Sequence, residues 1–256
     1  HSWLLNPNNV NRAILSPEVQ QFIDDNLRES ASSVALRKSP FPEVSSRELA
    51  EQIDSKQRAA KKLPLWFTTK GLYFPPKLSI EQASSEATAL YKTTLIQGEH
   101  IIVLTGGFGV DSFYFSRKAR VTHVELNAEI SEIAEYNAKV LGAGDIEFVS
   151  ADGMDYLRNV SETFGTIYID PSRRVKTQKV FRLADCEPDV VSNLTLLLMK
   201  ATRIIIKTAP LLDISSGLSE LKNVSEVHVV SLKNDCKELL WVIDRGFQGE
   251  PTVICA

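Results

Sequence analysis

The residues whose types and spacing most clearly suggest a binding or catalytic site follow an apolar run and include three glycines within four positions. The run at 100–104 leads into Thr105-Gly106-Gly107-Phe108-Gly109, and Asp111 follows two residues later. Glycines at such a junction let the backbone approach a ligand closely and adopt dihedral angles that other residues avoid. The segment therefore predicts a ligand-binding turn between a strand and a helix, of the kind that nucleotide cofactors and phosphates use.

Charged residues end the apolar runs that come after this turn. Glu125 ends the run at 121–125, and Asp152 and Asp170 follow the next two runs. Lys207 follows the run at 203–206. Open α/β sheets bind ligands at the carboxyl ends of their strands, so we expect these side chains to meet at one edge of a sheet. A carboxylate at the end of the second strand is placed to accept the hydroxyls of a ribose.

The elements that must position these residues alternate between apolar runs and amphipathic segments. This alternation predicts an α/β fold with a Rossmann-like, mostly parallel sheet. The runs at 228–232 and 238–243 predict a closing antiparallel hairpin around Lys233-Asn234-Asp235, which an NAD-binding sheet lacks. An NAD fingerprint that starts at Gly107 also fails, because it places Ser112 where a glycine or small apolar residue is needed.

This series resembles the class I methyltransferases that use S-adenosylmethionine (SAM), over roughly residues 78–245. The resemblance implies that Thr105–Gly109 contact the methionine part of SAM, Glu125 the ribose hydroxyls and Asp152 the adenine amino group. The predicted cofactor-binding residues are Thr105, Gly106, Gly107, Phe108, Gly109, Asp111, Glu125, Leu126, Asp152 and Gly153.

One position departs from that family. Many of its members place an acid just before the glycines to hold the amino group of SAM, whereas Val103 and Leu104 are aliphatic. Asp111, a backbone carbonyl or a residue of the N-terminal region is expected to take that role. A methyltransferase fold kept as a binding or scaffold module without activity is the alternative that this departure raises.

Asp170-Pro171 resembles the turn that ends the fourth strand of amino- and base-methylating enzymes. The resemblance assigns catalysis to Asp170, as acceptor of a hydrogen bond from the substrate, and to Pro171, which stiffens the turn. Ser172 and Arg173 replace the second proline and the aromatic residue of those turns. Methylation at carbon 5 of a pyrimidine would need a cysteine nucleophile near the fourth or fifth strand end, and the segment 207–210 has none.

Basic residues gather just after this turn. Arg173, Arg174, Lys176, Lys179 and Arg182 fall within ten residues that contain no acid, in a chain of net charge −3. Arginines can bind phosphate oxygens with two hydrogen bonds, so this segment predicts contact with RNA. The predicted substrate-binding residues are Ser172, Arg173, Arg174 and Lys207.

Lys207 has two open interpretations, as a phosphate anchor or as the partner of Asp170. We expect methyl transfer to a base nitrogen of tRNA or rRNA. The remaining alternative is a small-molecule methyltransferase with the N-terminal helices as a lid.

Residues 1–77 are expected to form a helical cap, and residues 78–256 the methyltransferase domain. Ser16-Pro17-Glu18 and Ser45 with Glu48 predict helix starts. Ser79-Ile80-Glu81-Gln82 predicts a capping box that opens one long helix through Lys92. The run at 81–86, with Tyr91-Lys92, resembles a bacterial methyltransferase group that carries a THUMP-like RNA-binding domain after the catalytic one. That domain is absent from this sequence, whose two ends suggest an expressed fragment.

The composition limits the classes of protein to which this chain can belong. With 256 residues, 43% of them apolar, the chain can bury a full core. Three cysteines without short spacing argue against a disulfide framework and a zinc site, so no metal is expected. No apolar run reaches the roughly 18 residues that a bilayer requires, and no signal peptide is recognisable, so a cytoplasmic location without membrane contact is expected. Nothing in the sequence fixes the oligomeric state.

Overall fold

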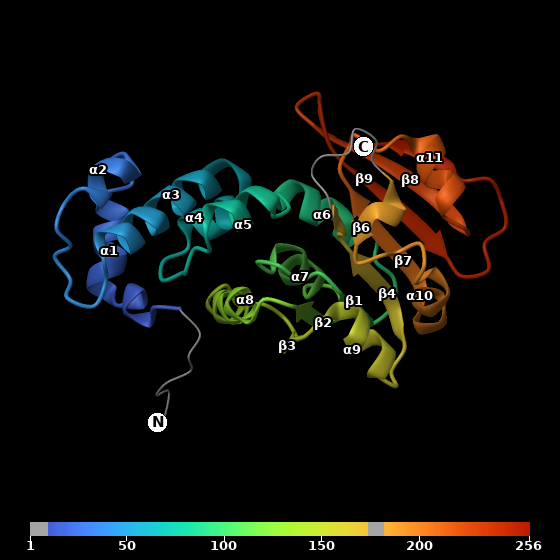
Figure 1. Ribbon diagram of the computed structural model, residues 1–256, viewed down its shortest axis with the longest axis horizontal. Helices are drawn as coiled ribbons and strands as arrows, with labels where there is room; N and C mark the ends of the chain where they lie inside the picture. Colours follow the sequence, from blue (N-terminus) through green and yellow to red (C-terminus); the bar gives the residue numbers. More distant parts are fainter. Residues whose placement is uncertain (1–9, 174–181) are drawn as a thin grey trace.

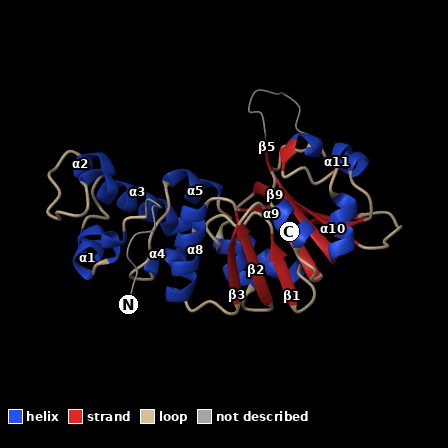
Figure 2. Ribbon diagram, turned by 60° about the horizontal axis from the view of Figure 1, so that its bottom comes forward, coloured by secondary structure: helices blue, strands red, loops and turns tan. Residues whose placement is uncertain are grey.

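The computed structural model describes residues 10–173 and 182–256, with the backbone alone at Arg173. Figure 1 shows an elongated molecule, with the N-terminal helices at one end and an α/β part at the other. Figure 2 shows the strands side by side in one twisted sheet. The basic residues Arg174, Lys176 and Lys179 lie outside the described ranges.

The described strands form an eight-stranded sheet in the order β10-β8-β9-β7-β4-β1-β2-β3, and a separate pair, β5 and β6. The strands of the large sheet are β1 (His100–Val103), β2 (Arg120–Glu125), β3 (Ile146–Ser150), β4 (Phe164–Ile169), β7 (Ala201–Thr208), β8 (Val224–Leu232), β9 (Asp235–Asp244) and β10 (Thr252–Cys255). The separate pair is β5 (Ser172–Arg173) with β6 (Cys186–Glu187).

The sheet confirms the predicted topology. Neighbours among β3, β2, β1, β4 and β7 are parallel, and β9 runs antiparallel between β7 and β8. Lys233 and Asn234 join β8 to β9 with φ angles of 54° and 62°, the left-handed geometry that a tight hairpin requires. The strand order reverses between β1 and β4, which is where open α/β sheets bind ligands.

Helices cover both faces of the sheet. The described helices are α1 (Pro17–Asp25), α2 (Ala31–Ala35), α3 (Ser46–Lys62), α4 (Pro64–Thr68), α5 (Lys77–Gln82), α6 (Glu86–Leu95), α7 (Val110–Phe115), α8 (Ala128–Val140), α9 (Gly153–Asn159), α10 (Leu194–Lys200) and α11 (Ile214–Glu220). Short 3-10 turns cover Arg12–Leu15 and Leu183–Asp185.

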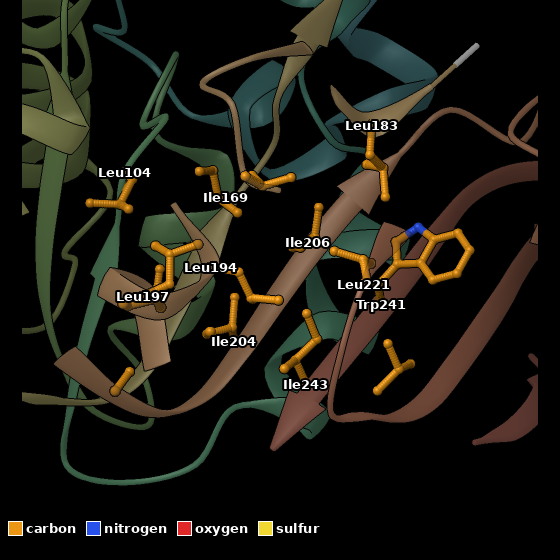
Figure 3. Packing of buried hydrophobic residues seen from close by; sticks show 14 of the residues in the cluster. Leu104, Ile169, Leu183, Leu194, Leu197, Ile204, Ile206, Leu221, Trp241 and Ile243 are labelled. Atoms are coloured by element: carbon orange, nitrogen blue, oxygen red, sulfur yellow. The ribbon is translucent and has the colours of Figure 1, made fainter. Parts of the chain in front are cut away.

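Because both faces are covered, consecutive residues of the central strands β1, β2, β4 and β7 are buried, rather than alternate ones. In β7, Ile204 and Ile206 face the layer of α9, α10 and α11, and Ile205 faces the layer of α6 and α7. Figure 3 shows the first of these layers, with Trp241 of β9 beside Leu221. A Cβ atom on Gly217 would lie 2.3 Å from the Trp241 ring, so α11 packs directly on that ring.

The N-terminal helix starts confirm two predicted caps. The Ser16 hydroxyl accepts a hydrogen bond from the Val19 amide at the start of α1. Ser45 and Glu48 form the predicted capping box at the start of α3. A serine that bonds an otherwise unpaired amide of the first turn stabilises a helix by about 1 kcal/mol.

The prediction of one long helix from Ser79 through Lys92 is wrong. Helix α5 follows Pro76 without a side-chain cap and ends at Gln82, and Ala83 is extended. Helix α6 then starts after Ser85, whose hydroxyl accepts from the Thr88 amide. The break has a tertiary cause, because the intervening Ser84 hydroxyl donates to the Asp111 carboxylate at 2.7 Å.

Trp66 of α4 joins the N-terminal helices to the rest of the molecule. Its ring is buried and lies 5.0 Å from the ring of Phe113, 6.0 Å from that of Tyr114 and 6.4 Å from that of Phe108. The first two residues belong to α7, and Phe108 belongs to the glycine turn. The N-terminal helices therefore support the turn that precedes α7.

Replacing this ring should destabilise the whole chain. We expect Trp66→Ala to lower the free energy of unfolding by about 3–5 kcal/mol, because a large ring leaves a closely packed cluster. Leu36→Ala is the control, since Leu36 is 89% exposed and such a change is usually worth no more than about 0.5 kcal/mol. Urea unfolding measures both, and equal stabilities of the two variants would contradict this account of Trp66.

Candidate active site

A cleft of about 620 Å³ opens at the carboxyl ends of β1, β2, β4 and β7. This volume lies in the range of small-molecule and cofactor pockets. The predicted site residues that line it are Thr105, Gly106, Gly107, Phe108, Gly109, Asp111, Glu125, Asp170, Pro171, Ser172 and Lys207. Residues from α5 and the turn after it add Ser79, Gln82, Ala83 and Ser84 to the wall.

The glycine turn has the backbone conformation that its residues predict. Gly107 and Gly109 have φ angles of 53° and 87°, in the left-handed region that side chains disfavour. Gly106 is needed for space, because a Cβ atom there would lie 2.3 Å from the His123 ring. The turn therefore exposes backbone to the cleft and rests on a buried imidazole.

Glu125 holds this turn from the end of β2. Its Oε2 accepts from the amide of Gly107 at 2.7 Å, and its Oε1 accepts from the amide of Asn127 at 2.8 Å. A carboxylate has about four acceptor sites, so each oxygen keeps room for a further donor. Glu125 can thus fix the backbone around it and still accept the hydroxyls of a bound ribose.

Asp170 and Lys207 lie on the neighbouring strand ends of the same cleft. Lys207 Nζ donates to Asp170 Oδ2 at 2.6 Å, and the Asp170 amide donates to the Thr105 hydroxyl at 2.8 Å. Burial alone would lower the pKa of the Lys207 ammonium, but Asp170 and Glu238 outweigh it and raise that pKa above its usual value. Of the two interpretations of Lys207, the structure shows the pair with Asp170.

Three predicted cofactor residues are absent from the cleft lining. Asp152 caps α9, where its Oδ1 accepts from the Asp155 amide at 2.9 Å. Gly153 packs so closely that a Cβ atom would lie 2.2 Å from the Leu104 carbonyl oxygen. Leu126 is 71% exposed. Their roles in cofactor binding remain predictions.

A buried cluster of charges below the cleft contains two residues that the sequence analysis did not place in the site. Lys92 of α6 has no exposed side-chain surface, and its Nζ lies 2.9 Å from Asp111 Oδ1 and 3.3 Å from Glu238 Oε1. Both had a signal in the sequence. Lys92 lies three residues after Ala89 on the buried side of α6, and Glu238 begins an otherwise apolar run of β9.

The predicted substrate-binding residues are only partly described. Ser172 is exposed, and the backbones of Ser172 and Arg173 pair with β6 in antiparallel fashion. Arg174 lies outside the described residues, as does the Arg173 side chain. Cys186 is buried in β6.

The described residues contain neither a cluster of metal ligands nor a membrane-spanning helix. Between residues 10–173 and 182–256, no three His, Cys, Asp or Glu side chains come together as metal ligands would. In the same ranges, no helix has both the length and the apolar character needed to cross a bilayer.

His123 of β2 is a core residue. Its ring is completely buried, its Nδ1 shares a hydrogen bond with the Ser112 hydroxyl at 2.8 Å, and burial lowers its pKa to about 3. The imidazole beneath Gly106 is therefore neutral in the folded protein. The unfolded chain, with an ordinary histidine pKa of about 6.5, binds a proton at a higher pH than the folded one.

This difference predicts a pH dependence of stability. As pH falls below about 6.5, His123 should cost the fold about 1.4 kcal/mol per pH unit, because only the unfolded state gains the proton. We expect His123→Gln to remove that slope between about pH 6.5 and 5. Urea unfolding of both proteins across this range measures it, and parallel stability profiles would show that His123 does not titrate as proposed.

Comparisons with known proteins agree with this geometry. No protein-family model matches the chain. A candidate methyltransferase from Porphyromonas gingivalis W83 is 31% identical, with a TM-score of 0.82, over 94% of this chain and 60% of its own. An uncharacterized RNA methyltransferase of Mycoplasma mobile is 26% identical over 143 residues, which cover 53% of this chain and 39% of the relative.

The cofactor-bound protein Rv0187 from MTB shares the fold, with 13% identity and a TM-score of 0.50 over 73% of this chain and 89% of its own. The chain spans 39% of the length of the Mycoplasma mobile relative and 60% of that of the Porphyromonas gingivalis relative. Its sheet order, its glycine turn and these similarities show a Rossmann-like methyltransferase fold.

Proposed function

We propose that this chain binds SAM in the cleft and transfers its methyl group to a base nitrogen of RNA. One observation carries the proposal: the glycine turn, the Glu125 carboxylate and the Asp170–Lys207 pair all open on one cleft. Cofactor and acceptor can therefore meet at the carboxyl ends of β1 and β4, where the strand order reverses.

The residues of the cleft suit the parts of this cofactor. Backbone exposed at Gly107 and Gly109 allows close approach, and Glu125 retains acceptor sites for ribose hydroxyls. SAM supplies a methyl group that its sulfonium has already activated, so the protein chiefly aligns the acceptor and removes its proton.

Asp170 is the residue that we propose for proton removal. Lys207 occupies Oδ2 of its carboxylate, which leaves Oδ1 to accept a hydrogen bond from an acceptor N–H. The Thr105 hydroxyl accepts from the Asp170 amide, and the buried Pro171 follows it, so the backbone at this position is held on both sides. The charged Lys207 orients the carboxylate before any substrate arrives.

The lining of the cleft supports nitrogen rather than carbon 5 as the acceptor atom. Carbon-5 methylation of a pyrimidine proceeds through a cysteine nucleophile. Of the described residues that line the cleft, none is a cysteine.

RNA as the substrate class has two supports. The Mycoplasma mobile relative is named an RNA methyltransferase. The sequence places Arg173, Arg174, Lys176, Lys179 and Arg182 just after the catalytic turn, although most of that segment lies outside the described residues. We further propose that residues 1–77 act as a cap, since the described part of this region contacts the glycine turn through Trp66 and Phe108.

A labelling experiment tests the proposal. The chain is incubated with bulk tRNA or rRNA and SAM that carries a tritiated methyl group, and the labelled nucleoside is identified by mass spectrometry. We expect a nucleoside methylated on a base nitrogen. Label at carbon 5, or label confined to small molecules, would contradict the proposal.

Asp170→Asn tests the catalytic assignment. The variant should lose methyl transfer by about 100-fold or more, because it cannot take up a proton. Its affinity for S-adenosylhomocysteine, measured by calorimetry, should stay within about threefold. Asp213→Asn is the matched control, since Asp213 caps α11 outside the cleft lining and should leave transfer unchanged. Full activity of Asp170→Asn would show that this turn is structural.

A further inference from the structure

We propose that Lys92 is a positioning residue, whose buried ammonium holds the Asp111 carboxylate in the cleft wall so that this carboxylate receives the α-ammonium group of the cofactor. The inference rests on the proposed cofactor but adds roles that the resemblance did not assign. The resemblance left the holder of that amino group open, because Val103 and Leu104 are aliphatic. Strand β1 (His100–Val103) contains no acidic residue that could take their place.

Both oxygens of Asp111 are fixed by the same ammonium. Lys92 Nζ lies 2.9 Å from Asp111 Oδ1. Nζ also donates to the Ser84 hydroxyl at 2.6 Å, and that hydroxyl donates to Asp111 Oδ2 at 2.7 Å. Contact with both oxygens sets the position and rotation of the carboxylate.

Lys92 cannot meet a ligand itself. Its side chain has no exposed surface, and its remaining contacts are Glu238 Oε1 at 3.3 Å and the Tyr168 hydroxyl at 3.4 Å. Asp111, by contrast, lines the cleft beside Ser84, and 14% of its side chain is exposed. Any effect of Lys92 on a bound molecule must therefore pass through Asp111 or Ser84, the two of its partners that line the cleft.

The other carboxylates of the cleft lining have their own internal partners and proposed roles, Glu125 toward the ribose and Asp170 toward the methyl acceptor. Glu125 accepts from two backbone amides, and Asp170 accepts from Lys207. Asp111 lies two residues after Gly109, next to the turn assigned to the methionine part of SAM. Its place in the cleft wall beside that turn makes it the acid that we assign to the amino group.

The charge balance of the cluster favours one more cation. Lys92 contacts Asp111 and Glu238, and the neighbouring Lys207 pairs with Asp170, so the group holds two ammonium groups for three carboxylates. Burial raises the pKa of the Glu238 carboxyl above its usual value even with Lys92 and Lys207 nearby. An incoming ammonium beside Asp111 supplies the missing positive charge.

Two ligands distinguish an effect on the amino-acid group of the cofactor from a general effect on the cleft. S-adenosylhomocysteine carries the amino-acid group, and 5′-methylthioadenosine keeps the adenosine and sulfur but lacks that group. We expect Lys92→Met and Asp111→Asn each to weaken S-adenosylhomocysteine binding by about 10-fold or more, the usual cost of a lost hydrogen bond to a charged group. Affinity for 5′-methylthioadenosine should change by less than about threefold in calorimetric titration.

A double variant tests whether Lys92 acts through Asp111. Once Asp111→Asn is present, adding Lys92→Met should cost little further affinity for S-adenosylhomocysteine, whereas independent structural effects would add. Ser84→Ala removes the hydroxyl between Lys92 and Asp111 without unpairing a buried charge, so it serves if Lys92→Met does not fold. It should weaken S-adenosylhomocysteine binding by about threefold or more and leave 5′-methylthioadenosine binding unchanged.

These measurements distinguish a failure of the role of Lys92 from a failure of the proposed function. Unchanged S-adenosylhomocysteine binding in the variants, or an equal loss for both ligands, would overturn the role of Lys92 while leaving the cofactor assignment intact. Binding of neither ligand by the unsubstituted chain would overturn the proposed function itself.

Discussion

A single buried ammonium group brings together three distant parts of the chain. Lys92 of α6 has no exposed surface, and a charge removed from water is tolerated only with close partners. Those partners are Asp111 at the start of α7 and Glu238 in β9. The helix before the sheet, the turn after its first strand and its antiparallel strand must therefore meet at one point, directly below the cleft.

Internal partners also hold the charged side chains that line the cleft. Asp111 and Ser84 form one wall, and the Asp170–Lys207 pair forms another at the ends of β4 and β7. Glu125 fixes the glycine turn from the end of β2. Internal partners thus fix the positions of the charged side chains at these strand ends before a ligand binds. A site built in this way aligns reactants with little rearrangement, which is what transfer of an already activated group requires.

Local patterns predicted the features that depend on neighbours in the sequence. The apolar runs became β1, β2, β3, β4 and β7, and the caps at Ser16 and Ser45 formed because each needs only the next three residues. The helix break at Ala83 combines a local cap, Ser85 with Thr88, and a contact of Ser84 with Asp111, which lies 27 residues away and cannot be read from the local pattern. Glu238 stands out in the sequence as an acid beside an apolar run, but only the folded sheet shows that it reaches Lys92.

The central claim is that the cleft at the strand ends binds the cofactor through Glu125. Calorimetric titration with S-adenosylhomocysteine, of this chain and of Glu125→Ala, tests it most directly. The account predicts saturable binding at one site that is lost in the variant, because the variant loses both the ribose acceptor and the carboxylate that holds Gly107. Equal binding by the two proteins, or no binding by the unsubstituted chain, would contradict it.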